Sequence, residues 1–331
     1  MSRSLVIALD SSDLSARALP FAQAIAEQWR ERLILVHASS SEDGVAPVPL
    51  ELELHDLVRK LSEEGINADA VVRAAEPAQA IVDVAAERGA DLIVMASHQR
   101  HGLDRWLNGS ITEKVLSLSR TPLLVVPSQT STTRTRSQRI LIPLDGTGVG
   151  EAPLDFLRDR ATTRPIDVLL LRVVSDAPIV VGMNPAFTAT PLTPAEMEAE
   201  VREASRYLAD LAESISDDRV STHYRVIEAA EPVPRVIVRT ARREGADLIA
   251  LGSHAKSGMS RLVLGSVSEE ILERSPIPVL LLRQKVAAPR PPLGPVLMSA
   301  AAASHGPKPD STRRWAGWQV RGSACAAVAG T

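Results

Sequence analysis

The chain has 331 residues, of which 45% are hydrophobic and 23% are charged, so it is long enough for two ordinary domains with substantial cores. Its 37 Lys and Arg residues nearly balance 40 Asp and Glu residues, and the formal net charge of -3 gives no electrostatic reason to expect nucleic acid or an anionic membrane as a partner. The single cysteine, Cys325, excludes an intramolecular disulfide and a zinc site built on several thiolates.

Short apolar runs rich in Val, Ile and Leu alternate with amphipathic stretches of helical period through the first half of the chain. This pattern predicts strands at 4–10, 32–38, 68–74, 91–96 and 122–127. It predicts helices at 14–30, 50–64, 77–88 and 110–119. Strands with hardly a polar residue are typical of a parallel sheet that is covered by helices on both faces. We therefore expect a doubly wound α/β domain over residues 1–128.

The same order of segments returns in the second half. LVIALDSSD at Leu5 is answered by ILIPLDGTG at Ile140, and the long stretch EPAQAIVDVAAERGADLIVMASH at Glu76 by EPVPRVIVRTARREGADLIALGSH at Glu231. The last strands, RTPLLVVP and SPIPVLLLR, correspond as well. The sequence thus predicts two tandem doubly wound (Rossmann-like, flavodoxin-like) domains, each with a five-stranded parallel sheet, the second over residues 139–284.

The spacing between the two halves indicates an insertion in the second. Asp10 and Asp145 are 135 residues apart, whereas His98 and His254 are 156 apart. The extra residues fall most plausibly in DAPIVVGMNPAFTATPLTPAE, a segment rich in Pro, Gly and Thr that reads as a surface loop before a helix opened by Pro194.

Two further segments lack any core pattern. Residues 129–138 are polar and without periodicity, which predicts a linker between the domains. Residues 285–331 are rich in Pro, Gly and Ala and are predicted to form a disordered tail.

Each fourth strand is followed by a loop and then by a Gly-Ser pair that opens a helix. The stretch is ASHQRHGLDRWLNGSITEKVL from Ala96 and GSHAKSGMSRLVLGSVSEEIL from Gly252. In open α/β sheets, ligands bind beyond the carboxyl ends of the strands, near the point where strand order reverses. A helix N-terminus offers free N–H groups to an anion, and glycine lets a phosphate approach the backbone. Gly265-Ser266 and its counterpart in the first half therefore predict a site for a nucleotide phosphate.

A structural interpretation of the same residues is equally compatible with the spacing. Ser266 with Glu269, and Ser110 with Glu113, spell the capping box S-x-x-E, in which the serine bonds to helix N–H groups. A cap uses one or two of the free donors and leaves others for a phosphate.

The pattern Gly252-x-x-Ala255-(nine residues)-Gly265-Ser266 resembles the universal stress protein family, whose ATP-binding members carry G-x-x-G-(nine)-G-[S/T]. The Leu-Asp ends of both first strands, the Glu-Pro openings of both third helices and the Ser-His after both fourth strands are also similar to that family. The similarity covers about residues 4–127 and 139–283, so the chain is identified by resemblance as a tandem member.

The resemblance implies binding of ATP or a related adenine nucleotide, which could carry a magnesium ion. In nucleotide-binding members the aspartate closing strand one contacts adenine or ribose, residues of strands two and four line the adenine pocket, and the Gly-Ser loop holds ribose and phosphates. Carried over to the second half, these are Pro143, Leu144, Asp145, Val173, Leu251, Gly252, Ala255, Gly265, Ser266, Val267 and Ser268. In the first half they are Ala8, Leu9, Asp10, Ala38, Met95, Ala96, Gln99, Gly109, Ser110, Ile111 and Thr112.

Departures from the family pattern favour the second half as the nucleotide site. There, Ala255 adds one methyl group where the family has glycine, whereas in the first half Ala96 and Gln99 replace both early glycines. Basic residues near the loops are secondary candidates for phosphate contacts: Arg100, Arg105, Lys256 and Arg261.

No residue is assigned to catalysis. GTGVG at Gly146 lacks the last glycine of a dinucleotide fingerprint, because Glu151 stands there, and neither half contains a Walker A sequence. His98 and His254 have no nucleophile or acid that spacing would pair with them. The lone carboxylates of the first strands make a poor metal cage, so no metal site is predicted.

The sequence thus predicts a non-enzymatic, cytoplasmic sensor or regulator of stress responses, with at most weak ATPase activity. Only five consecutive apolar residues, 5–9, precede Asp10, and no run of about twenty suggests a membrane span. The two halves are expected to pair through PLLVVP and PVLLLR, and a homodimer of tandem chains is left open. The alternative is a nucleotide-independent interaction scaffold. An enzyme of the adenine-nucleotide α-hydrolase type would need an SGGxD-like loop after strand one, which the sequence lacks.

Overall fold

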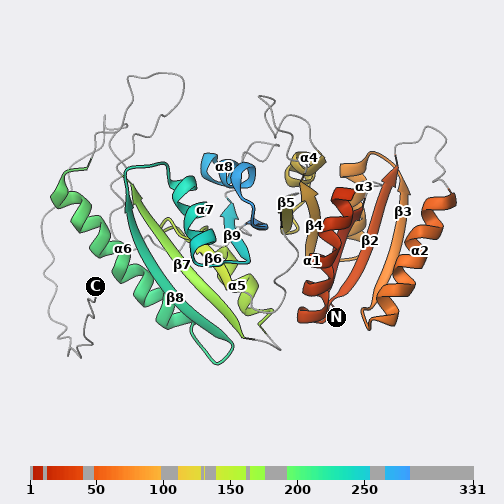
Figure 1. The fold of residues 1–331 in the computed structure, drawn as a ribbon, viewed down its shortest axis with the longest axis horizontal. Coiled ribbons are helices and arrows are strands. Elements are labelled where there is room, and N and C mark those ends of the chain that lie inside the picture. Colours follow the sequence, from red (N-terminus) through yellow and green to blue (C-terminus); the bar gives the residue numbers. More distant parts are fainter. Residues whose placement is uncertain are drawn as a thin grey trace, which may run out of the picture. The chain divides into compact units, whose positions relative to one another are not determined.

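A computed structural model describes residues 3–9, 13–39, 48–97, 111–127, 130, 139–161, 165–175, 192–253 and 265–283 (Figure 1). The strands of the first half are β1 (Ser4–Leu9), β2 (Arg32–Ser39), β3 (Ala68–Ala74), β4 (Leu92–Ser97) and β5 (Leu123–Pro127). Its helices are α1 (Asp13–Trp29), α2 (Val48–Glu63), α3 (Pro77–Glu87) and α4 (Ile111–Leu118). The strands of the second half are β6 (Arg139–Pro143), β7 (Ile166–Ser175), β8 (Val220–Ala229), β9 (Leu248–Ser253) and β10 (Val279–Arg283). Its helices are α5 (Ala152–Arg158), α6 (Pro194–Ile215), α7 (Val233–Arg243) and α8 (Ser266–Arg274).

The elements of the first half follow the predicted ranges to within one residue for strands and two for helices. Local chemistry explains several boundaries. Pro77 occupies the first position of α3, and the Glu76 side chain accepts a hydrogen bond from the Gln79 N–H (3.0 Å). Helix α6 begins at Pro194 as predicted, behind a capping box formed by Thr193 and Glu196.

All ten strands join one sheet in the order β3-β2-β1-β4-β5-β10-β9-β6-β7-β8. Every pair within a half is parallel, whereas β5 and β10 pair antiparallel. The prediction of two doubly wound domains with five parallel strands each is therefore confirmed. Within the first half the strand order 3-2-1-4-5 is that of Rossmann sheets and differs from the flavodoxin order 2-1-3-4-5. Pairing of the halves through their last strands, as expected, is also observed.

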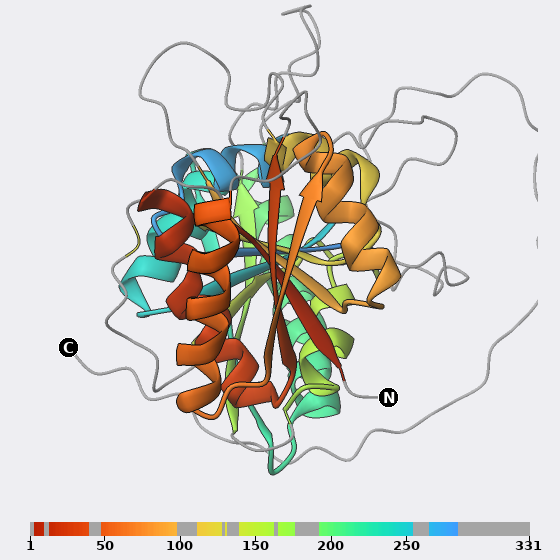
Figure 2. The same cartoon turned by 90° about the vertical axis from the view of Figure 1, so that its right-hand side faces the viewer.

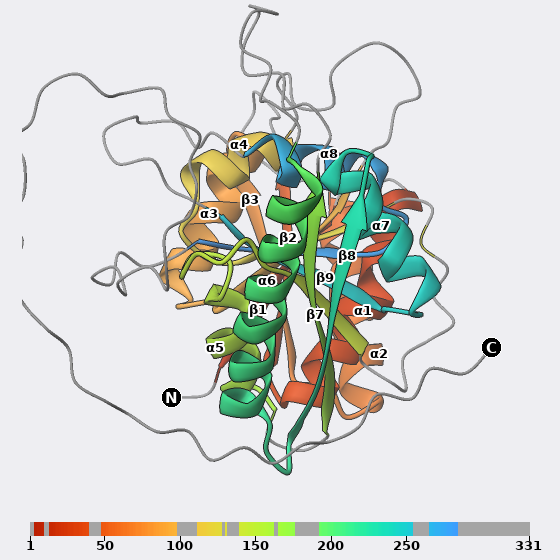
Figure 3. The ribbon, with the colours of Figure 1, turned by 90° about the vertical axis from the view of Figure 1, so that its left-hand side faces the viewer.

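Two apolar clusters cover the two faces of the sheet. One joins residues of α1, α2, α5 and α6 to alternate strand positions, and the other joins residues of α3, α4, α7 and α8 to the remaining positions. Figure 2 shows the red and orange-red helices α1 and α2 on the opposite side of the strands from the lighter orange α3, and Figure 3 shows α6 and α7 on either side of β8. Both clusters contain residues of both halves.

The first helix of the second half is much shorter than its counterpart. Helix α5 has 7 residues and α1 has 17. The loop before α5, residues 145–151, contains three glycines where the first half has Ser11, Asp13 and Ser15, and glycine is a poor helix residue. One of them, Gly146, has a φ of +82°, a conformation that other residues rarely adopt.

This loop lies against the end of β9. A Cβ atom built on Gly252 would stand only 1.8 Å from the backbone oxygen of Val149, so no side chain fits there while the loop keeps its place. The equivalent position of the first half carries Ala96, and there the chain has already entered α1 at Asp13. The backbone of Val149, in the same domain, therefore requires glycine at position 252.

The predicted linker, most of the insertion and the predicted tail lie outside the described residues, apart from Thr130 and residues 192–196. None of the described helices combines the length and apolar character that crossing a membrane requires.

We expect Gly252→Ala to lower the free energy of unfolding by about 1–3 kcal/mol, because the new methyl group displaces the loop of residues 145–151. Urea denaturation followed by circular dichroism measures the change. Ala96→Gly is the matched control and should cost only about 0.5–1 kcal/mol through backbone entropy. Equally small losses for both variants would show that the loop does not constrain Gly252.

Candidate functional site

The pocket residues predicted in the first half lie near the carboxyl ends of β1, β2 and β4, next to the point where strand order reverses. Ala8 and Met95 pack with the cluster that includes α3 and α4. Leu9 and Ala96 pack with the cluster that includes α1, and Ala38 lies near the end of β2. In the first turn of α4, Ile111 is exposed and Thr112 is buried. The remaining first-half candidates lie outside the described residues: Asp10, Gln99, Gly109 and Ser110.

The second half repeats this arrangement. Pro143 ends β6 and Leu144 follows it, while Val173 and Leu251 pack with the cluster that includes α7 and α8. Gly252 precedes the last residue of β9. The candidates at the beginning of α8 are Gly265, Ser266, Val267 and Ser268. Ala255 lies outside the described residues.

A basic side chain of the second strand holds the end of the first strand in both halves. His37 Nδ1 lies 2.9 Å from the carbonyl oxygen of Leu9, and Arg172 Nη1 donates to the carbonyl oxygen of Leu144 (3.3 Å). Because a carbonyl oxygen only accepts, Nδ1 of His37 carries the hydrogen. The two positions are equivalent, in LVHA and LLRV, and both bonds fix the residue before the predicted site aspartate. This role was not predicted, although the basic residue at the same position of both halves could have indicated it.

In the second half, the site aspartate organises its own loop. Asp145 Oδ1 accepts hydrogen bonds from the N–H (2.9 Å) and the hydroxyl (2.6 Å) of Thr147. At the end of the loop, the Tyr207 hydroxyl donates to Glu151 Oε1 (2.9 Å). Burial, followed by the nearby Glu151 carboxylate, raises the pKa of Tyr207, so its hydroxyl stays protonated and remains a donor.

The N-terminus of α8 differs from the predicted capping box. The N-cap residue is Gly265 and makes no side-chain cap, because Ser266 stands one position later, as the first residue of the helix. Gly265 has an ordinary φ of -63°, and a Cβ built on it would meet no atom of the described residues within 4 Å. The capping-box interpretation is therefore wrong for Ser266. In the first half, Ser110 is not described.

Two buried hydroxyls occupy the same position in both halves. Ser97 ends β4 and Ser253 ends β9; they are 1% and 5% exposed. Neither Oγ has a hydrogen-bond partner in the part of the chain that the structure describes. By strand alternation, each serine lies on the same face as Met95 or Leu251, the face that α4 and α8 cover. A buried hydroxyl without a partner costs about 1–3 kcal/mol, which makes both positions candidates for a ligand contact that the sequence analysis did not assign.

The histidines and basic residues of the two loops lie outside the described ranges: His98, His254, Arg100, Arg105, Lys256 and Arg261. Among the residues that are described, no three His, Cys, Asp or Glu side chains gather where they could hold a metal ion.

Residues 1–127 and 136–283 each match the universal stress protein family. One universal stress protein of Mycobacterium tuberculosis is 28% identical over 232 residues, which cover 68% of this chain and 74% of the relative. Another from that organism is 24% identical over 300 residues, covering 85% and 97%. The solved structure of a putative universal stress protein from Pseudomonas aeruginosa superposes with a TM-score of 0.61 at 22% identity, covering 85% of this chain and 93% of that one, which shows a shared fold. Together with the repeated α/β architecture, the two family matches show that the chain belongs to the universal stress protein family and carries two of its domains in tandem.

Proposed function

We propose that the chain binds an adenine nucleotide beyond the carboxyl ends of β1 and β4 and of β6 and β9, and that it regulates a stress response through this binding. The observation that carries the proposal is the pair of buried hydroxyls of Ser97 and Ser253, neither of which has a partner among the residues that the structure describes. A structural serine would be expected to have a partner, and here the same orphaned group recurs in both halves at the place where doubly wound sheets bind ligands.

The surrounding residues suit a nucleotide. Ala8 and Val173 are only partly buried near the ends of their strands and could give a flat base apolar contacts, whereas Met95 and Leu251 lie buried beneath in the core. At the N-terminus of α8, the N-cap glycine makes no side-chain cap and a Cβ on it would meet no described residue within 4 Å, an arrangement that suits a phosphate group. When bound, the nucleotide would supply the negative charge that this helix end stabilises.

A regulatory role follows better than an enzymatic one from these residues. Asp145 is the only acid among the described second-half candidates, so a magnesium ion would be held mainly by the nucleotide phosphates. Among the site residues that the structure describes, no pair of groups is arranged for acid–base chemistry, and we infer at most weak ATPase activity. The single cysteine supports a cytoplasmic location for this regulator.

A nucleotide-independent scaffold is the second candidate, and two observations favour it. The space beside Gly252 is taken by Val149, and Asp145 Oδ1 is already bonded to Thr147. Both features show the second-half loop satisfied by its own residues.

Substitution at Gly265 separates the two candidates. We expect Gly265→Val to weaken ATP binding to the second half about ten- to a hundredfold, because its side chain occupies the space beside the helix N–H groups that a charged phosphate would bond. Calorimetry with ATP measures the affinity. Gly265→Ser is the control for folding: serine is a better N-cap than glycine, so stability should hold or rise while its hydroxyl competes for the same N–H groups. If the wild-type chain binds no nucleotide at millimolar concentration, the scaffold is the correct candidate.

Removing the orphaned hydroxyls should separate binding from stability. Ser97→Ala and Ser253→Ala should leave the free energy of unfolding unchanged or slightly raised, because each replaces an unpartnered polar group with an apolar one. Each should weaken nucleotide binding at its own site about five- to tenfold through the lost hydrogen bond. Thermal unfolding with and without ATP reports both effects. A marked loss of stability without nucleotide would instead assign the serines a structural role.

A further inference from the structure

A buried ion pair joins the two halves beside the β5–β10 contact. Nε of Arg160, which follows α5 in the second half, lies 3.1 Å from Oε1 of Glu31, which precedes β2 in the first. The two side chains are 5% and 0% exposed. The Arg160 guanidinium is also 3.8 Å from Asp91 Oδ1, at the start of β4.

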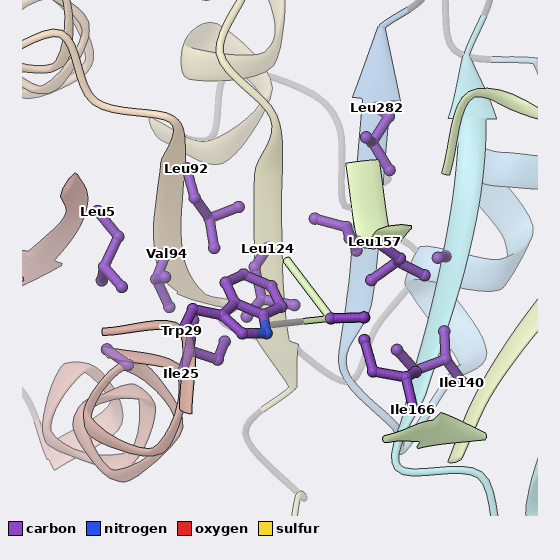
Figure 4. Packing of buried hydrophobic residues seen from close by; sticks show 14 of the residues in the cluster. Leu5, Ile25, Trp29, Leu92, Val94, Leu124, Ile140, Leu157, Ile166 and Leu282 are labelled. Atoms are coloured by element: carbon purple, nitrogen blue, oxygen red, sulfur yellow. The ribbon is translucent and has the colours of Figure 1, made fainter. Parts of the chain in front are cut away.

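Aromatic rings from both halves enclose the guanidinium. Its carbon lies 3.7 Å from the ring centre of Phe156 and 5.4 Å from that of Trp29. These rings meet edge to face, with centroids 5.9 Å apart. Figure 4 shows Trp29, from the end of α1, among buried residues of both halves, including Leu124 and Leu157. A second bond across the same boundary runs from Arg3 Nη1 to the carbonyl oxygen of Asp159 (2.7 Å).

The stability of the fold alone does not explain this buried ion pair. Burial raises the pKa of Glu31, and the nearby Arg160 opposes that rise, while burial lowers the pKa of Arg160. No oxygen of Glu31 accepts an aligned hydrogen bond from the described residues. Buried ion pairs of this kind are often no more stable than apolar residues of similar volume, whereas removing one partner is strongly destabilising. The pair therefore needs another explanation.

The strand contact itself does not distinguish the halves. Leu124 faces Leu280, its own counterpart, and the flanking pairs are Val125 with Val279 and Leu123 with Leu281. Two copies of β5, or two copies of β10, would meet with nearly the same apolar side chains. Nothing in these strands prevents like halves of two chains from pairing.

The ion pair does distinguish them. The counterpart of Arg160 in the first half is Ile25, and the counterpart of Glu31 in the second half is Ile166; both are buried in the same cluster. Because equivalent residues face each other across the strand contact, two first halves would place Ile25 against Glu31. Two second halves would place Arg160 against Ile166. Each like pair would therefore bury two charges without their partners.

Asp91 and its counterpart reduce the cost of these buried charges only partly. Its counterpart, Asp247, would stand near Arg160 in a pair of second halves, but Asp247 Oδ2 already accepts the backbone N–H of Arg139 (3.0 Å). A pair of first halves has no cation at position 25, so each Glu31 carboxylate would lose Arg160 and keep Arg3, whose charge also favours the ionised carboxylate.

We propose that the Arg160–Glu31 pair selects the partner of the last-strand interface, so that a first half pairs with a second half and not with another first half. The pair acts by excluding the wrong combination, since a buried charge without its partner penalises every like pair. Because only a short linker connects the two halves, pairing within one chain is then favoured over pairing between chains.

The test starts from the folded full chain, which is then cut between its two halves. A protease site is placed between residues 129 and 138, the chain is cleaved, and the two pieces are unfolded and refolded together. Native mass spectrometry then counts unlike pairs, first half with second, against like pairs. For the wild type, unlike pairs should exceed like pairs at least about a hundredfold. In Glu31→Ile with Arg160→Ile, where each residue becomes its counterpart, like pairs should rise toward the statistical share.

Two more variants make the result decisive. Glu198→Ile with Arg202→Ile removes an exposed ion pair of α6 and should leave the wild-type ratio unchanged. In Glu31→Arg with Arg160→Glu the charges are exchanged, so its halves should pair with each other and reject wild-type halves in a mixture. A wild type that forms like pairs freely would overturn the proposal. So would free mixing of the charge-exchanged halves with wild-type ones, even if the double isoleucine variant does not fold.

Discussion

The antiparallel contact of β5 with β10 is the constraint from which the arrangement of the two halves follows. Both strands are apolar, and β5 is buried along its whole length. Without a partner, each half would expose an apolar strand edge with free N–H and C=O groups, which is a template for unwanted pairing. Their contact satisfies both edges at once. It also joins the apolar clusters of the two halves into continuous ones, so that α1 and α5 contribute to the same core.

One short segment contributes both to the candidate site and to the contact between the two halves. Residues 145–160 begin at the end of β6, lie against Gly252 through Val149, form α5 and finish with Arg160 beside Glu31. Outside the insertion before α6, the segment also contains a clear difference between the halves, since α5 is shorter than α1 by more than two turns. This difference between the repeats lies between the candidate site and the contact of the two halves.

Periodicity was enough to predict the elements, because apolar spacing reflects which side of a strand or helix is buried. It could not decide the strand order, since Rossmann and flavodoxin sheets use the same runs of residues. Nor could it place Val149 against Gly252, a contact between residues distant in sequence. The capping box failed for a local reason: α8 begins at Ser266, which moves the serine out of the N-cap position. The orphaned hydroxyls of Ser97 and Ser253 were visible in sequence only as a repeated residue without a role.

The glycines of the motif therefore say less about whether a nucleotide fits the site than their spacing suggests. Gly252 is explained by its own loop, so the replacement of its counterpart by Ala96 is not evidence that the first half has lost a site. What the two halves share is the buried serine at the end of the fourth strand and the basic side chain that holds the end of the first. What distinguishes them is the loop of residues 145–151. If the proposed function holds, a nucleotide in the second half has to fit beside Val149 or move it, whereas residues 13–16 of the first half already belong to α1. On that proposal the loop, more than the number of glycines, decides which half is the more accessible.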